Sequence, residues 1–156
     1  MHCVECAHYK KISSPQNKKR ILIIKIAAMG DVLRTTFLLQ GLKEIYPDSI
    51  ISRIVSRTNA SVLEHNILID NIVFNDENVN YYLVNNFFDI VISLDLAYES
   101  LSLAKLANKS KILGFTLDNK RNIITSNEFA QKWIQMSGYD DLKKLIFSHT
   151  NTGCQK

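Results

Sequence analysis

One short segment of this sequence places an acidic side chain where it could do chemistry. The segment is Ala27-Ala28-Met29-Gly30-Asp31; an apolar, largely β-branched run precedes it and apolar residues of helical spacing follow it. It would therefore join a buried strand to a helix, with Asp31 at the carboxyl end of the strand, where open parallel sheets bind ligands. A carboxylate there could accept a proton from a bound hydroxyl. The structural alternative is a helix N-cap, a backbone hydrogen bond worth about 1 kcal/mol.

A second group of possible ligands lies near the N-terminus. Cys3 and Cys6 form a Cys-x-x-Cys pair with His2 and His8 nearby, and thiols with imidazoles could hold zinc. Structural zinc sites usually combine two such pairs, and the sequence has no second one, so a polar segment with unengaged thiols is the alternative. The three cysteines, with Cys154 the third, do not favour a disulfide framework. We expect a cytoplasmic protein without a metal or cofactor of its own.

Composition and motifs argue against several other functions. The net charge of +4 comes from scattered basic residues, without the dense basic and aromatic stripe of a nucleic-acid-binding domain, so we expect no nucleic-acid partner. No apolar run is long enough to cross a bilayer, and the N-terminal residues lack the apolar core of a signal peptide. The first turn has a single glycine, Gly30, and no Gly-Lys-Ser or Gly-Lys-Thr occurs, so the common dinucleotide and NTPase motifs are absent.

The rest of the chain predicts the elements that would position Asp31. Apolar runs predict strands at 21–26, 50–55, 72–74, 87–95 and 111–113, and helical patterns lie between most of them. Gly114 is expected to stop the fifth strand. Asp95, at the end of the fourth, could line the ligand site or cap the next helix, and we favour the cap. The alternation favours an α/β domain with a Rossmann-like parallel sheet and flanking helices.

A different pattern follows the fifth strand. Thr125-Ser126-Asn127-Glu128 is a capping box, and Phe129, Trp133 and Met136 recur at helical spacing, which predicts a helix with one large apolar face. We therefore divide the chain into four parts: a polar leader (1–19), a Rossmann-like domain (20–124), a helical extension (125–147) and a disordered tail (148–156).

The segment around Asp31 also resembles a known family. Residues 21–47, with Gly-Asp after an apolar strand and Tyr-Pro at the end of a helix, are similar to the opening of glycosyltransferase family 9, the heptosyltransferases of lipopolysaccharide synthesis. The similarity continues through 88–95 and into 133–138, so it covers most of residues 20–147. Phe37 stands where the family usually has proline, a departure that would alter the start of the first helix.

The resemblance implies a fold and a reaction. Members of this family have a two-domain GT-B fold, in which an N-terminal domain binds the acceptor and a C-terminal domain binds the nucleotide-sugar. They invert the anomeric centre in one displacement, without a metal, and use the Gly-Asp aspartate as general base. The resemblance thus assigns this role to Asp31, which would deprotonate the acceptor hydroxyl as it attacks and the pyrophosphate leaves.

Other residues could contact such an acceptor because of their position and chemistry. Gly30 precedes the base, Arg34 and Thr35 lie one turn into the helix, and Arg57 and Thr58 follow the second strand. A guanidinium and a hydroxyl at either place could bind a phosphorylated sugar. The alternative for each is an ordinary solvated surface residue.

The resemblance also implies partners. The chain ends where the family's second domain would begin, so we expect a truncated or split enzyme that supplies only the acceptor side. A saccharide or glycolipid acceptor would bind here, and a separately encoded C-terminal domain would bind the nucleotide-sugar. The alternative is a stand-alone saccharide- or protein-binding module without chemistry. Membrane contact would be peripheral at most, at the inner face of the cell membrane.

Overall fold

The computed structural model describes residues 18–126, which form one sheet with helices on both faces. The strands are β1 (Arg20–Ile24), β2 (Ile50–Val55), β3 (Asn71–Phe74), β4 (Phe87–Ser93), β5 (Asn108–Leu117) and β6 (Ile123–Thr125). The helices are α1 (Met29–Arg34), α2 (Phe37–Ile45), the 3₁₀ helix η1 (Arg57–Val62), α3 (Val79–Asn85) and α4 (Tyr98–Leu106). Among these helices none is long and apolar enough to cross a membrane.

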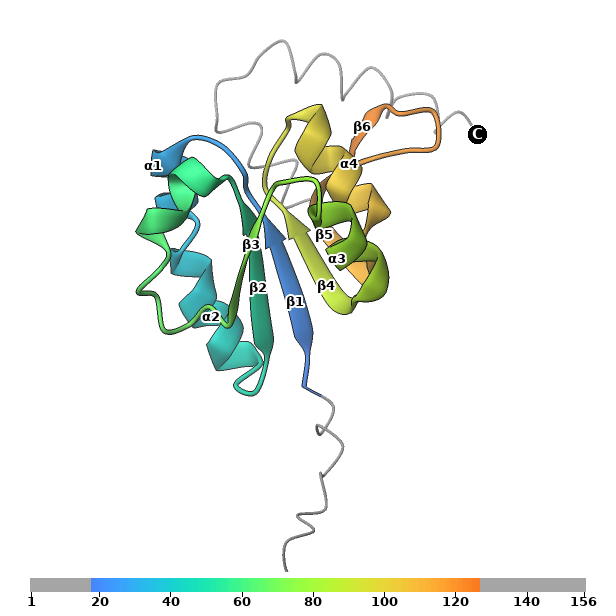
Figure 1. Cartoon of the computed structure of the whole chain (residues 1–156). Coiled ribbons are helices and arrows are strands. Elements are labelled where there is room, and N and C mark those ends of the chain that lie inside the picture. The colour runs from blue at the N-terminus through green and yellow to red at the C-terminus, as the bar shows by residue number, and fades with distance from the viewer. Residues whose placement is uncertain (1–17, 127–156) are drawn as a thin grey trace, which may run out of the picture.

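The strand order explains where a ligand site belongs. The order is β3-β2-β1-β4-β5-β6, with parallel pairing from β3 through β5 and an antiparallel β6. The chain therefore builds outward from β1 to β3, then crosses back to place β4 on the other side of β1. Such a reversal leaves a crevice beyond the carboxyl ends of the two central strands, the usual ligand site of open α/β sheets. These ends point upward in Figure 1. The predicted Rossmann-like α/β fold is confirmed.

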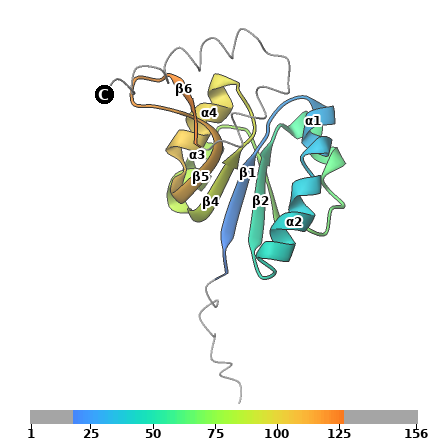
Figure 2. The same ribbon diagram turned by 180° about the vertical axis from the view of Figure 1, so that it is seen from behind.

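The core lies on both faces of the central strand. Ile21 to Ile24 are fully buried, and alternate side chains of a strand point to opposite faces. Ile21 and Ile23 pack in a cluster with Leu39 of α2, whereas Leu22 and Ile24 join a cluster with residues of α3 and α4. Figures 1 and 2 show the result: α1 and α2 on one side of the sheet, α3 and α4 on the other. A run of apolar residues without polar alternation is what this double burial requires.

The first helix differs from the prediction because it is interrupted. Thr35 and Thr36 separate α1 from α2, and their hydroxyls donate to the carbonyls of Val32 (2.8 Å) and Leu33 (2.7 Å). Threonine side chains that bind backbone groups in this way compete with regular helix. Phe37, at the family's proline position, begins α2 and is 70% exposed. The helix ends at Ile45, just before Tyr46-Pro47, as predicted.

The end of the sheet also departs from the prediction. Gly114 does not stop β5; the strand passes through it with φ of 98° and continues to Leu117. A Cβ at this glycine would lie 2.0 Å from the carbonyl oxygen of Ser93, so only glycine permits the close approach of β5 to β4. Beyond it, β5 pairs with β6, which ends at Thr125. Thr125 is therefore a strand residue and not a helix start.

Several predictions fall on parts of the chain that the structure does not describe. Asn127 and Glu128 of the capping box and the apolar helix face at Phe129, Trp133 and Met136 lie outside the described residues. The same holds for Cys3 and Cys6 with their neighbouring histidines, so the zinc hypothesis remains a prediction.

Candidate functional site

The candidate site forms where the chain leaves β1, β2 and β4. The Leu94 N–H donates to the Ile24 carbonyl at 3.1 Å, which joins the end of β4 to that of β1. The Ile26 carbonyl accepts the Ser56 N–H at 3.3 Å and the Asn59 side-chain amide at 3.1 Å, which joins β1 to the segment after β2. These hydrogen bonds give the three strand ends a fixed relative position, and α1 begins three residues beyond Ile26.

Asp31 lies inside α1 and does not cap it. The N-cap is Ala28, whose carbonyl accepts the N–H groups of Asp31 and Val32 at 2.9 Å each. The N-cap alternative for Asp31 is therefore wrong: Asp31 is the third residue of the helix, and its side chain, 39% exposed, is available for other contacts. Ala28 has φ of 60°, a conformation that non-glycine residues rarely adopt and that is frequent next to functional residues.

Two cations approach the Asp31 carboxylate from different sides. Lys25 Nζ lies 3.5 Å from Oδ2, and Arg34 Nη1 lies 3.7 Å from Oδ1. The Lys25 side chain is 10% exposed, whereas that of Arg34 is 74% exposed. One carboxylate oxygen thus faces a buried positive charge, and the other faces an exposed one. Gly30 adds open space at this place, since a Cβ on it would meet nothing within 4 Å.

A second carboxylate completes the buried part of the site. Asp95 Oδ1 lies 3.6 Å from Lys25 Nζ and accepts the Leu96 N–H at 2.9 Å, and Oδ2 accepts the Ile26 N–H at 3.3 Å. Burial by itself would raise the pKa of Asp95, but the Lys25 ammonium and the N–H groups of Ala97 and Ile26 outweigh it and hold that pKa below its ordinary value. The N-cap of α4 is Ala97, so the predicted capping role of Asp95 is not observed. Its carboxylate instead links the ends of β1 and β4.

Thr35 is turned toward the interior. Its hydroxyl donates to the Val32 carbonyl and accepts from Nη2 of Arg53 at 2.7 Å. Arg53 reaches this point from β2 and is fully buried. Burial lowers the pKa of Arg53 to about 10, so the guanidinium is still charged at neutral pH. The structure thus gives Thr35 a role in holding the end of α1, and contact with an acceptor remains only a prediction.

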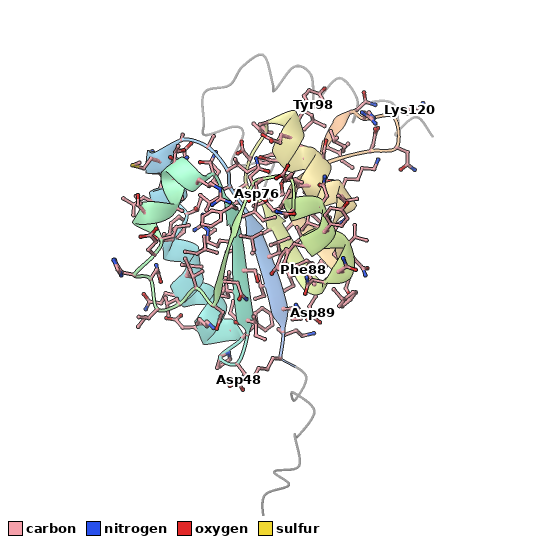
Figure 3. The ribbon with its side chains drawn as sticks, in the orientation of Figure 1. Asp48, Asp76, Phe88, Asp89, Tyr98 and Lys120 are labelled. Carbon is pink, nitrogen blue, oxygen red and sulfur yellow. The ribbon has the colours of Figure 1, made fainter. Side chains whose placement is uncertain are left out.

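Arg57 and Thr58 are the first two residues of η1, and Arg57 lies against the end of β3. Arg57 Nη2 lies 2.8 Å from Asp76 Oδ2, and its guanidinium stacks 4.4 Å from the centre of the Phe74 ring. The Thr58 and Ser56 hydroxyls lie 3.0 Å apart. Figure 3 shows Asp76 near the upper end of the strands. The structure therefore brings Gly30, Asp31 and Arg34 together, and it directs Arg57 toward the end of the neighbouring strand.

Sequence reasoning missed two buried cations. Lys25 could have been noticed, because it is the one charge in the apolar run 21–26 and follows directly after the strand. Arg53 could not have been placed, because nothing in its surrounding strand pattern indicates a contact with α1. Within residues 18–126, no group of three or more His, Cys, Asp or Glu side chains is arranged to hold a metal. A shallow hollow of about 500 Å³ between η1 and β3 contains none of the candidate residues; Ser61, Val62, His65, Asn66, Ile67 and Leu68 line it.

Comparison with solved structures identifies similar folds. The E. coli heptosyltransferase WaaC with ADP matches with a TM-score of 0.55 and 22% identity, over 61% of this chain and 34% of that one. A family 9 glycosyl transferase from Veillonella parvula matches with a TM-score of 0.52 and 22% identity, over 78% and 42% of the two chains. The matches thus span 34–42% of the length of these proteins. No protein-family model and no curated protein matches the sequence. The expected glycosyltransferase-like fold is confirmed.

Proposed function

We propose that this chain is the acceptor-binding half of an inverting, metal-independent glycosyltransferase and that Asp31 is its general base. The observation that carries the proposal is the position of Asp31. Its carboxylate is partly exposed at the carboxyl end of the central strand, in a fold shared with two solved glycosyltransferases. This is where an open α/β sheet holds its ligand.

The reaction would proceed as one displacement. Asp31 takes the proton of an acceptor hydroxyl while the oxygen of that hydroxyl forms a bond to the anomeric carbon of the donor sugar. The bond from that carbon to the diphosphate breaks on the opposite side, and the nucleoside diphosphate leaves with the electron pair, which inverts the configuration. A second domain would supply the bound nucleotide-sugar. The residues of this chain bind the acceptor and move its proton.

The acceptor we propose is an anionic saccharide of the lipopolysaccharide type, free or as a glycolipid. Arg34 supports this choice, because its exposed guanidinium lies 3.7 Å from the base and could bind a phosphate or carboxylate of the sugar. The open space at Gly30 would let a sugar ring approach Asp31. Arg57 and Thr58 would contribute only after exchanging their present partners. The reaction would take place in the cytoplasm, at most at the inner surface of the membrane.

Saccharide binding tests the acceptor side without a donor domain. A phosphorylated inner-core oligosaccharide is titrated into ¹⁵N-labelled protein, and saturable shifts are expected at Gly30, Asp31 and Arg34. Arg34→Gln should weaken binding about tenfold, since a charge-assisted bond is lost. Arg121→Gln, an exposed arginine in the turn before β6, is the matched control and should bind like wild type. Absence of saturable binding would contradict an acceptor site here.

A further inference from the structure

Lys25 is a buried cation shared by two carboxylates from different parts of the fold. It follows β1, while Asp31 belongs to α1 and Asp95 follows β4; the two Nζ–O distances are 3.5 and 3.6 Å. We propose that Lys25 is the positioning residue of the candidate base: it holds Oδ2 of Asp31, so that Oδ1 is presented to the acceptor. The proposal that Lys25 orients the Asp31 side chain is supported by these contacts. The importance of this orientation for catalysis rests on the proposed function.

The backbone at Lys25 is fixed by both neighbouring strands. The Lys25 N–H donates to the Ile54 carbonyl of β2 at 3.3 Å, and the next N–H, that of Ile26, donates to Asp95. The Lys25 side chain is only 10% exposed. A long side chain that leaves a fixed backbone and is packed on its sides has few accessible rotamers, so its ammonium has a defined position. Arg34, at 74% exposure, cannot define the orientation of Asp31 in this way.

Asp95 makes this arrangement possible because it neutralises Lys25 in place. A buried ammonium is unfavourable unless a well-held opposite charge accompanies it. The Asp95 carboxylate is held by the N–H groups of Ile26, Leu96 and Ala97, and its side chain is 11% exposed. Lys25 is therefore paired without Asp31. The negative charge of Asp31 is not needed to neutralise Lys25. The Asp31 carboxylate is therefore available to take up a proton and release it again.

The alternative is that Lys25 serves only the fold through Asp95. The two roles differ in what they predict for Asp31. A purely structural lysine would leave the conformation of Asp31 unchanged when it is replaced, whereas a positioning lysine would not. A direct measurement of the Asp31 side-chain rotamer therefore separates them, and it requires neither donor nor acceptor.

The test measures the three-bond N–Cγ and C′–Cγ couplings of Asp31 by NMR in the full chain. Wild type should show one χ1 rotamer. Lys25→Met should show couplings averaged over several rotamers, and Lys25→Arg should restore one rotamer. Lys43→Met is the matched control, because Lys43 also pairs with an aspartate, Asp70, at 3.1 Å but at the opposite end of the sheet. Couplings of Asp31 that stay as in wild type in Lys25→Met would overturn the proposal.

A folding control keeps the test decisive. Lys25→Met leaves Asp95 buried without its cation, so the variant could lose its fold for that reason alone. In the double variant Lys25→Met/Asp95→Asn this charge is removed too, and the same couplings are measured. Averaging at Asp31 in the double variant supports the proposal, and a single retained rotamer refutes it.

Kinetics then connect the position of Asp31 to the reaction. In transfer assays with a donor domain, Lys25→Met should lower kcat at least tenfold with the acceptor KM within twofold, and Lys25→Arg should recover most of the rate. A rise in KM with kcat unchanged would overturn the catalytic meaning of the contact. If the wild-type pair transfers no sugar, the proposed function fails, and the NMR couplings still decide the positioning role.

Discussion

At Asp31 the two oxygens of one carboxylate meet different surroundings, and this difference carries the chemical interpretation. Oδ2 faces a buried ammonium whose position is set by the sheet, and Oδ1 faces solvent and the exposed Arg34. Only the second oxygen is free to meet a substrate. The carboxylate is therefore held on one side and open on the other, so that a bound hydroxyl could come within hydrogen-bond reach of the open oxygen.

Asp31 should contribute little to stability. Replacement by asparagine leaves Lys25 paired with Asp95, and the exposed Arg34 remains solvated, so no buried charge loses its partner. Asp31→Asn should change the free energy of unfolding by less than about 1 kcal/mol, as expected for partly exposed ion pairs. Urea denaturation measures this value. A loss of several kcal/mol would mean that Asp31 is a structural residue.

Asp95 should make the free energy of unfolding depend on pH in the acidic range. Its pKa is lowered in the folded state, so between the folded and unfolded pKa values the unfolded chain binds more protons. Its contribution is fully present above the unfolded value of about 3.9 and is lost as the pH falls through the lower folded value. The free energy of unfolding, measured from pH 6 to pH 2.5, should decline less steeply in Asp95→Asn. The exposed Asp48→Asn should follow wild type.

At the scale of the element, α1 is held at both ends by buried cations of unequal importance. Lys25 contacts the Asp31 side chain in its first turn, and Arg53 donates to the Val32 carbonyl at 3.5 Å near its last turn. Lys25 has two carboxylate partners. For Arg53, residues 18–126 provide no acidic partner, and its Nε and Nη1 have no hydrogen bond among them.

This contrast predicts opposite effects of the same substitution. Arg53→Met removes a buried charge without a counter-ion, and the Val32 carbonyl keeps the Thr35 hydroxyl as donor, so stability should be unchanged or higher by about 1 kcal/mol. Lys25→Met leaves Asp95 without its cation and should cost about 3 kcal/mol. Thermal and urea unfolding of the two variants decide the matter. A larger loss in Arg53→Met than in Lys25→Met would contradict this assignment.

Gly114 should be the glycine on which the sheet depends most. Alanine there would bring a Cβ to 2.0 Å from the Ser93 carbonyl oxygen at a φ of 98°, so strain and overlap together should cost about 3 kcal/mol. Gly41→Ala is the matched control in the middle of α2, where a Cβ meets nothing within 4 Å, and it should stabilise the protein by about 0.5–1 kcal/mol. Equal effects of the two substitutions would show that β5 can adjust.

At the scale of the molecule, the sequence predicted those features of the fold that depend on neighbouring residues in the chain. The apolar run 21–26 requires burial on both faces, and Pro47 requires the end of α2, so these features followed from the sequence. The passage of β5 through Gly114 and the bond from Arg53 to Thr35 depend on contacts between distant segments, so they did not. The position of Asp31 at the end of the central strand was predictable. The contact of Lys25 with Asp95 depends on β4 lying beside β1, which chain order does not specify.

The whole fold places the candidate base at an edge that a second domain could face. The candidate site lies beyond the carboxyl ends of β1 and β4, and the solved glycosyltransferases of similar fold are more than twice as long as the segment they share with this chain. We therefore expect transfer only when a donor domain is supplied. A binding module without chemistry would bind the saccharide regardless of Asp31 and would not transfer sugar in any pairing.

Sugar transfer by the chain paired with a donor domain tests the assignment of Asp31 most directly. Transfer by wild type, Asp31→Asn and Asp48→Asn is measured with a labelled nucleotide-sugar as donor. Asp48 is the control because it lies at the end of the sheet opposite Asp76 (Figure 3). We predict that Asp31→Asn lowers transfer by about 10²–10⁴-fold with saccharide binding within twofold, and that Asp48→Asn equals wild type. Transfer by Asp31→Asn at the wild-type rate would contradict the assignment of Asp31 as the base.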